Sequence, residues 1–268
     1  MTRRTLAQPV TLEGQAVRTH GGPVNLTLAP GEHGFVFTRT DTGQRLPADL
    51  AHLAPAPNCT ALGDGRPAVF FVEHVLSALA GLGYTDAEVT VDGPEVPLFD
   101  GSARPLVEAL AAAGSAGLSG TVEPLRLTAP VRYEHQGQVL EAFPAESWAV
   151  DYTFEHAHPM IAFDQVAATL DDYATSLAPA RTFATVQEIQ ALQAAGLIRG
   201  GSEDNLLLIY DDHLSSPLRL DHEFARHKVL DLIGDLALLG RPLLAQLVAR
   251  RTGHSDNHAF ARLLQDTL

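Results

Sequence analysis

The chain is poor in cysteine and has no long hydrophobic run. Its single cysteine, Cys59, excludes an internal disulfide and favours a reducing compartment. No stretch approaches the roughly 18 consecutive apolar residues that a membrane-spanning helix needs. The N-terminal segment from Met1 to Pro9 contains arginines but no apolar core follows it, so no secretory signal peptide is predicted. We therefore expect a cytoplasmic protein without a membrane span.

Basic residues are also scarce. Lysine and arginine number 18 against 32 acidic residues, and the net charge of −14 opposes any nucleic-acid partner. Only one of the basic residues, Lys228, is a lysine. A hydrophobic fraction of 46% with 19% charged residues is normal for a packed globular protein and too apolar for a disordered one. The 268 residues suffice for one large domain or two of about 120–140 residues.

The order of predicted elements suggests two α+β halves. Strands are expected at 24–28, 35–38, 69–72, 87–92, 125–133, 138–143, 148–154 and 205–210. Helices are expected at 73–83, 103–113, 184–195, 222–239 and 259–267. The segment 114–120 is small, glycine-rich and without periodicity, so it is predicted to be a flexible linker between domains 1–119 and 120–268. One helix in each half begins near a histidine and ends at a Leu-Gly pair, which is a weak sign of internal similarity.

Polar residues recur along one face of the predicted helix 222–239. His227, Asp231 and Asp235 follow one another at intervals of four, so they would line up over about two helical turns. Histidine and carboxylate are zinc ligands, and a catalytic zinc site has three protein ligands and one open position. His74, from the first half, would complete a set with His227 and Asp231, and Glu73 would act as general base. A histidine on an apolar helix is more often an ordinary core or surface residue, and only the His227/Asp231 spacing favours a ligand.

Two further residues are candidates for proton transfer and oxyanion stabilisation. His254 follows an arginine-rich stretch and would serve as general acid, with Asp235 as the carboxylate that keeps it protonated. Thr182 would place a hydroxyl donor near a developing oxyanion. Taken alone, an ordinary loop histidine and a threonine at the end of a strand are the better explanations of these two residues.

With these residues in view, the chain resembles the UDP-3-O-acyl-N-acetylglucosamine deacetylases, the zinc enzymes of lipid A biosynthesis. The matching motifs occur in the family's order at 72–83, 93–103, 180–183, 200–202, 227–235 and 253–254. The resemblance implies two similar domains, each a sheet packed on helices, with the active site between them. It also implies that His74, His227 and Asp231 bind zinc, with ferrous iron as the alternative metal. Glu73 would then be the base, His254 the acid, Asp235 its orienting partner and Thr182 the oxyanion donor.

The same resemblance assigns the substrate contacts. Lys228 would meet the diphosphate of a UDP-linked sugar, and Glu155 and His156 fall where the family contacts the nucleotide. An insert at about 183–201 would form a passage for the acyl chain, with the contacts Phe183, Val186, Ile189, Leu192, Leu197, Ile198 and Gly201. An ordinary helix burying its apolar stripe explains these residues equally well. Besides the UDP-linked acylated amino sugar, the expected partner is water, with no nucleic acid, and we expect a monomer.

The chain departs from the family pattern at a few positions. Arg18 occupies the place of a usual histidine, His20 looks like an insertion, and the stretch 59–72 is shortened. Gln136 and Gln138 stand where the family has basic residues near the nucleotide. These changes leave open two alternatives, a zinc amidase acting on another N-acyl amino sugar and a non-catalytic relative that binds nucleotide sugars or acyl chains.

Overall fold

The computed structural model describes residues 1–268, and its first half contains a five-stranded sheet. The strand order is β2 (Val10–Gln15), β3 (Pro23–Ala29), β9 (Ala87–Val91), β4 (Phe35–Arg39) and β5 (Arg45–Pro47). The central strand β9 is antiparallel to β3 and parallel to β4. Helix α1 (Glu73–Gly81) precedes β9 in the chain, and helix α2 (Arg104–Ala113) follows it. A small antiparallel sheet of β6 (Leu53–Ala54), β7 (Ala61–Leu62) and β8 (Val69–Phe70) leads into α1.

The second half repeats this arrangement strand for strand. Its sheet has the order β12 (Val131–His135), β13 (Gln138–Pro144), β18 (Leu243–Arg250), β14 (Ala149–Glu155) and β15 (Phe163–Thr169), and β11 (Leu125–Arg126) pairs with β18. The central strand β18 is antiparallel to β13 and parallel to β14, as β9 is to its neighbours. Helix α4 (Glu223–Leu236) precedes β18 and helix α5 (His254–Thr267) follows it. The predicted fold class of two similar α+β units is therefore confirmed.

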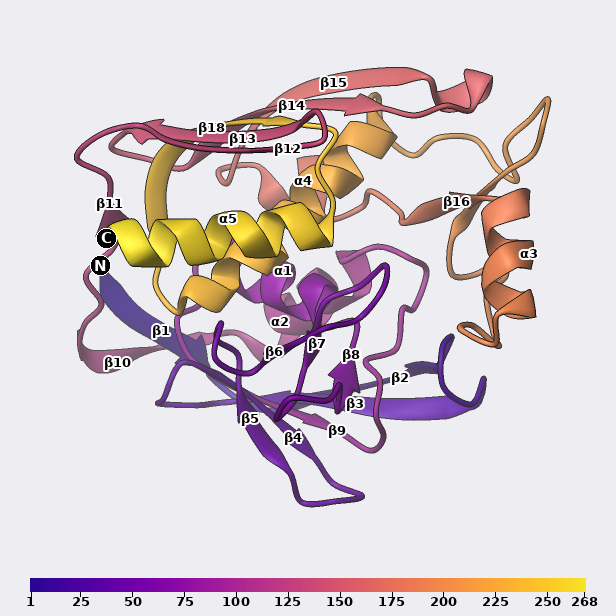
Figure 1. Ribbon diagram of the computed structural model, residues 1–268. Helices are drawn as coiled ribbons and strands as arrows, with labels where there is room; N and C mark the ends of the chain where they lie inside the picture. The colour runs from indigo at the N-terminus through magenta and orange to yellow at the C-terminus, as the bar shows by residue number, and fades with distance from the viewer.

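Helices α1, α2, α4 and α5 lie between the two sheets (Figure 1). Helices α4 and α5 contact strands of the second sheet, α2 contacts the first, and α1 packs directly on α4. One apolar core of 61 buried residues includes members of both halves, so the two sheets share a single hydrophobic interior. Outside this stack, β16 (Phe183–Thr185), α3 (Val186–Ala194) and β17 (Leu207–Ile209) form a unit at the right of the view. The two chain termini appear at the opposite end of the view.

Close approach of α1 and α4 depends on a glycine. A Cβ atom on Gly234 of α4 would lie 2.1 Å from the backbone oxygen of Glu73, at the start of α1. No side chain fits in that space, so the two helices meet backbone to backbone at this point. Gly83 ends α1 and Gly240 ends the short 3₁₀ turn after α4 (Ala237–Leu239), both with positive φ, as the Leu-Gly pattern predicted.

Two sequence-based predictions are wrong in detail, and one central strand has no sequence-based prediction. The segment predicted as a flexible linker is strand β10 (Ser115–Thr121), which pairs antiparallel with β1 (Thr2–Leu6). Its hydrogen-bond partner is the distant N-terminus, so nothing in the local pattern reveals the strand.

The final helix begins at His254 instead of Ala259, because Asp256 accepts a hydrogen bond from the backbone N–H of Gly253 and caps a polar first turn. The central strand β18 was not predicted, although its buried positions alternate. The domain boundary between 119 and 120 falls inside β10 and stays a prediction.

Short irregular helices complete the second half. They are a 3₁₀ turn at Pro159–Ile161 and a π-helical turn at Tyr173–Leu177. No helix of the chain has the length and apolar character needed to cross a membrane.

Candidate active site

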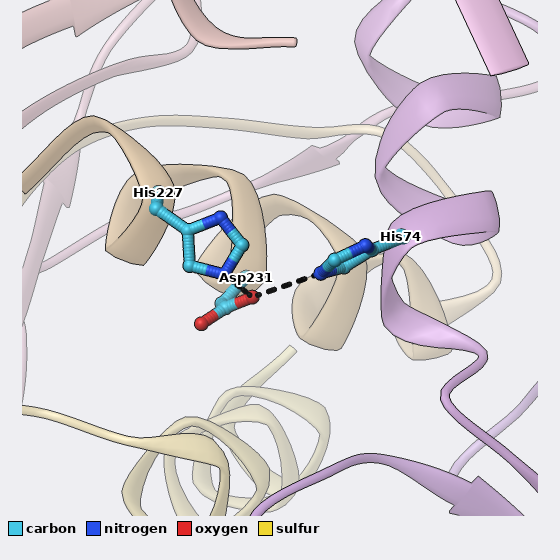
Figure 2. A group of neighbouring side chains, drawn as sticks. All are labelled: His74, His227 and Asp231. Atoms are coloured by element: carbon cyan, nitrogen blue, oxygen red, sulfur yellow. Dashed lines mark ion pairs between the residues drawn. The ribbon is translucent and has the colours of Figure 1, made fainter. Parts of the chain in front are cut away.

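Two helices from different halves bring His74, His227 and Asp231 together (Figure 2). His227 and Asp231 are one turn apart on α4, and the Nε2 atom of His227 lies 3.4 Å from Oδ1 of Asp231. His74, the second residue of α1, places its Nε2 atom 3.8 Å from the same oxygen. The three donor atoms lie within 4.8 Å of one another and all three residues are buried. They form a group that could hold a metal ion.

The two imidazoles are in the form that binds metals. The Nδ1–H of His227 donates to the backbone oxygen of Ala180 at 3.1 Å, which leaves the Nε2 lone pair free to face His74 and Asp231. Burial lowers the pKa of His227, and burial together with the neighbouring His227 lowers the pKa of His74 to about 3. Both rings are therefore neutral at physiological pH, as metal coordination requires.

The Asp231 carboxylate carries the negative charge of this group. Burial alone would raise its pKa, but Lys228 and the surrounding imidazoles outweigh burial and hold it well below the usual range. Lys228 donates from Nζ to Oδ2 of Asp231 at 2.8 Å, on the oxygen that does not face the two histidines. The lysine Nζ also lies 5.7 Å from the centre of the Phe183 ring, which itself packs edge-on against His227. Lys228 thus lies at the border between the donor group and the α3 unit.

Glu73 precedes His74 and is buried at the same end of α1. Its Oε2 atom accepts a hydrogen bond from the backbone N–H of Thr60 at 3.0 Å. Its Oε1 atom lies 3.9 Å from Nε2 of His254. Burial raises the pKa of Glu73 to about 8, although the charge of His254 opposes the shift. A carboxyl group with such a pKa can exchange a proton near neutral pH.

His254 is the first residue of α5 and lies across the site from Glu73. Its Nδ1 atom is 2.9 Å from Oδ2 of Asp235, and its Nε2 atom is 3.9 Å from Oδ2 of Asp231. Burial alone would lower the pKa of His254, but the carboxylates of Asp235 and Asp231 outweigh burial and raise it to about 10. His254 is therefore protonated at neutral pH, which is the state required of a general acid.

The Asp235 carboxylate has more partners than the sequence suggested. In addition to His254, it accepts hydrogen bonds from the Thr60 hydroxyl on Oδ1 and from the Asn257 amide on Oδ2 at 2.8 Å. His258, one turn after His254 on α5, places its Nε2 atom 2.8 Å from the Thr60 oxygen. Sequence reasoning missed Thr60 and His258. The His254/His258 spacing would have indicated a shared face had the helix been extended to His254, whereas no local signal marks Thr60.

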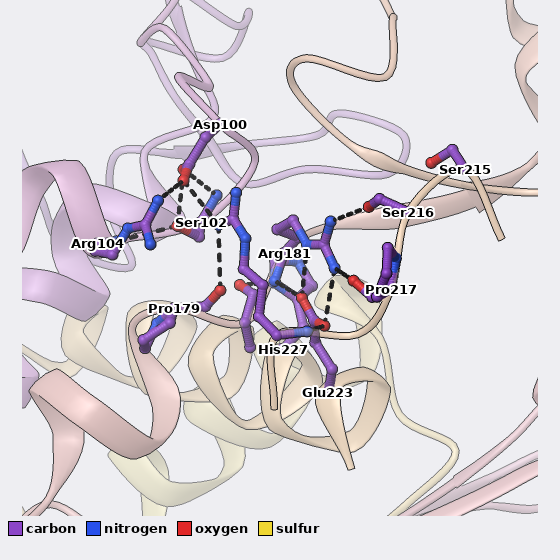
Figure 3. Close-up of polar contacts among 12 residues, drawn as sticks. Asp100, Ser102, Arg104, Pro179, Arg181, Ser215, Ser216, Pro217, Glu223 and His227 are labelled. Carbon is purple, nitrogen blue, oxygen red and sulfur yellow. Dashed lines mark hydrogen bonds and ion pairs between the residues drawn. The ribbon is translucent and has the colours of Figure 1, made fainter. Parts of the chain in front are cut away.

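A buried ion pair fixes the chain beside the donor group (Figure 3). The Nε atom of Arg181 donates to Oε1 of Glu223 at 2.8 Å, and its Nη2 atom donates to Oε2 at 3.0 Å. The backbone N–H of Arg181 also donates to Glu223, at 3.1 Å. Next along the chain, Thr182 donates its backbone N–H to the Gly101 oxygen at 2.7 Å, and its hydroxyl has no protein partner. The ion pair holds the segment that supplies both the carbonyl bonded to His227 and the Thr182 hydroxyl.

The predicted acyl contacts gather in the α3 unit. Ile189 and Ile198 form a small apolar cluster with Leu206, separate from the main core. Gly201 closes against this cluster, since a Cβ on it would lie 3.3 Å from Ile198 and 3.5 Å from Leu206. The other residues of the predicted passage are partly buried: Phe183, Val186, Leu192 and Leu197.

The predicted nucleotide contacts already have protein partners. Glu155, at the end of β14, accepts from Nη2 and Nε of Arg250 at 2.6 and 3.0 Å and lies 3.9 Å from Arg251. His156 lies 3.6 Å from Glu188 of α3. The structure thus places both residues at the edge of the second sheet, where His156 touches the α3 unit.

Two imidazole nitrogens and a carboxylate oxygen, flanked by a buried glutamate and an aspartate-linked histidine, define a metal-dependent hydrolase. Comparison with known proteins is more specific. The model of the UDP-3-O-acyl N-acetylglycosamine deacetylase family matches residues 3–266, and the chain belongs to that family of deacetylases. The resemblance found in the sequence is thereby confirmed, as is the prediction that the protein is an enzyme.

Curated relatives agree over nearly the whole chain. A protein of Leptospira biflexa is 38% identical over 270 residues, covering 98% of this chain and 89% of the relative. One of an Anaeromyxobacter species is 41% identical over 268 residues, covering 97% and 87%. One of Chlamydia muridarum is 38% identical over 274 residues, covering 99% and 96%. All three are named UDP-3-O-acyl-N-acetylglucosamine deacetylase.

Proposed function

We propose that this chain is a zinc-dependent hydrolase acting on UDP-3-O-acyl-N-acetylglucosamine. It removes the N-acetyl group to give UDP-3-O-acyl-glucosamine and acetate, the committed step of lipid A biosynthesis, and it acts as a monomer. The observation that carries the proposal is the meeting of His74, His227 and Asp231 beside Glu73 and His254. Membership of the deacetylase family supports the substrate.

A bound zinc ion explains the three donor residues better than a purely structural role does. The buried Asp231 carboxylate and two neutral imidazoles have their donor atoms within 4.8 Å of one another, an arrangement of lone pairs that a bound cation would stabilise. The hydrogen bond from His227 to the Ala180 oxygen is the outer contact that metal-bound histidines usually make. Two nitrogens and one oxygen form the donor set of several catalytic zinc sites, and ferrous iron accepts the same donors.

The acid and base are arranged for hydrolysis of an amide. A bound zinc would lower the pKa of water to about 7 and polarise the substrate carbonyl. Glu73 takes a proton from the attacking water, and the Thr182 hydroxyl donates to the oxygen of the tetrahedral intermediate. His254, held protonated by Asp235, gives its proton to the sugar nitrogen as the carbon–nitrogen bond breaks. The products are acetate and a free amine.

The substrate contacts extend from this centre towards the α3 unit. Lys228 is the cation nearest to Asp231, and its Nζ atom donates to the Asp231 carboxylate. A substrate diphosphate near Nζ would share the positive charge of Lys228 with that carboxylate. An acyl chain could enter between Ile189, Ile198 and Gly201. Its contacts with these residues would replace the contacts that they now make with one another. Glu155 and His156 would meet the nucleotide from the edge of the sheet.

A second candidate keeps the chemistry and changes the substrate. Arg18 replaces the family's usual histidine, and its guanidinium stacks 4.7 Å from the Phe70 ring and donates to the Pro57 oxygen at 3.3 Å. An arginine differs from an imidazole in charge and in reach. This difference would suit another N-acyl amino sugar. A silent binding protein would have no need of the complete acid, base and donor set.

The test is deacetylation by the purified protein. Metal content is measured by mass spectrometry, the metal is removed with a chelator, and zinc or ferrous iron is restored under anaerobic conditions. We expect one zinc per chain and acetate release that disappears and returns with the metal. Turnover of UDP-3-O-acyl-N-acetylglucosamine far above that of UDP-N-acetylglucosamine and free N-acetylglucosamine supports the proposed substrate. A metal-loaded protein that releases no acetate from any of them would overturn the enzyme assignment.

A further inference from the structure

His258 and Thr60 contact Asp235, but the proposed reaction gives neither of them a role. The Nε2 atom of His258 lies 2.8 Å from the Thr60 oxygen and 3.4 Å from Oδ1 of Asp235. The same Thr60 hydroxyl contacts Asp235 and lies 3.3 Å from Nδ1 of His254. Three separate parts of the chain meet here, namely the segment before β7, helix α4 and helix α5.

The donors and acceptors of this group can be assigned from its chemistry. The Asn257 amide nitrogen can only donate, and it points to Oδ2 of Asp235 beside the Nδ1 atom of His254. Oδ1 of the same carboxylate receives the Thr60 hydroxyl. A hydroxyl has one proton, so once Thr60 has donated to Asp235 its oxygen must accept from His258. The His258 ring therefore carries a proton on Nε2.

The direction of these bonds runs from His258 to Thr60, from Thr60 to Asp235, and from His254 to Asp235. A threonine hydroxyl rotates freely unless an acceptor and a donor fix it together. His258 is the donor that leaves only one orientation, with the proton aimed at Asp235. With Asp235 fixed on both oxygens, His254 keeps its Nδ1–H on the carboxylate and turns Nε2 towards Glu73.

We propose that His258 is a positioning residue that acts through Thr60 and Asp235 to hold His254 in its proton-donating orientation. The inference rests on the proposed function only in taking His254 as the acid. The charged and titratable groups that face His258 are Asp235 on α4 and His254 on α5, with Glu73 on α1 beyond His254. None of them is the second donor that Thr60 needs, because His254 donates to Asp235.

Three variants separate positioning from mere packing. His258→Leu removes the donor, whereas His258→Gln keeps an N–H at nearly the same reach without a titrating ring. His135→Gln, at the exposed end of β12, is the matched control. We expect kcat to fall about 10–100-fold in His258→Leu with little change in KM, the size typical of lost outer contacts at metal sites. His258→Gln should recover most of that loss. Only in the leucine variant should the basic limb of the pH profile move to lower pH, because His254 would no longer be held on the carboxylate of Asp235 that keeps it protonated.

A double-mutant cycle with Thr60→Val tests the route. If His258 acts through the Thr60 hydroxyl, His258→Leu should cost little more once that hydroxyl is gone. Additive losses of kcat in the double variant would overturn the proposal. A kcat of His258→Leu within about twofold of wild type would also overturn it, because a loss of about 10–100-fold is expected for such contacts. Equal zinc content and melting temperature across the variants exclude a folding defect.

A second measurement does not depend on turnover. Nitrogen-15 NMR of zinc-loaded protein reports which ring nitrogen of His254 carries the hydrogen-bonded proton. We expect a single Nδ1–H signal in wild type and His258→Gln, and an exchange-broadened one in His258→Leu. An unchanged signal in the leucine variant refutes the inference even if the wild type releases no acetate, whereas absent acetate release alone counts only against the proposed function.

Discussion

Gly234→Ala is the sharpest test of how the two halves form one site. The new Cβ would lie 2.1 Å from the Glu73 oxygen and 2.8 Å from its carbonyl carbon, about 1 Å closer than non-bonded atoms tolerate. Backbone atoms cannot rotate away, so α1 and α4 must separate by about that distance. His74 follows Glu73, and Asp231 lies one turn before Gly234, so the separation acts directly on the three donor atoms.

The magnitudes predict a loss of function larger than the loss of stability. Alanine gains about 1 kcal/mol of helix propensity over glycine, while overpacking costs about 1–3 kcal/mol. The difference is a net loss of about 0–2 kcal/mol, so the melting temperature should fall by only a few degrees. A metal site, however, tolerates shifts of only about 0.2 Å in its ligands, and a misplacement of about 1 Å can cost about 100-fold in rate.

The assay compares Gly234→Ala with Gly117→Ala, whose added Cβ meets no atom within 4 Å. Zinc affinity is measured by competition with a chromophoric chelator, turnover by acetate release, and stability by calorimetry. We expect weak zinc binding and about 100-fold lower kcat in Gly234→Ala, the loss associated with a shift of this size, and wild-type behaviour in the control. Wild-type zinc affinity and turnover in Gly234→Ala would show that the helix contact does not set the site.

Three further changes probe the acid, the base and the buried ion pair. Glu73→Gln should keep one zinc per chain but lower kcat by about 10²–10⁴-fold, as expected for a lost general base; parallel loss of zinc would contradict that role. His254 acts only when protonated, so activity falls as pH rises through its pKa. Removing the Asp235 charge lowers that pKa, so Asp235→Asn should move the basic limb of kcat/KM to lower pH, and an unmoved limb argues against His254 as the acid. Glu223→Gln leaves Arg181 buried without its anion and should cost about 3–5 kcal/mol, checked by denaturant unfolding; a loss below about 1 kcal/mol, the value of an exposed pair, would refute this reasoning.

Elements with strong periodicity were predictable, and elements paired with distant partners were not. Helices α1, α2 and α4 were expected within a few residues of their observed bounds, because apolar spacing and terminal glycines mark them locally. The local pattern predicts a linker where strand β10 lies, because the register of β10 comes from β1, more than a hundred residues away. The polar start of α5 was missed for a similar reason, because its cap depends on one side chain and not on periodicity.

The sequence by itself determined the family and the pairing of His227 with Asp231. The reason is geometric: along one helix, a spacing of four residues places two side chains on the same face in any tertiary context. It also marked His74, Glu73 and His254 as residue types suited to the chemistry. Only the tertiary structure decided that α1 meets α4 at Gly234, and that Thr60 and His258 surround Asp235. Those contacts join segments whose separation along the chain carries no information about distance in space, and packing of the shared core is what sets them.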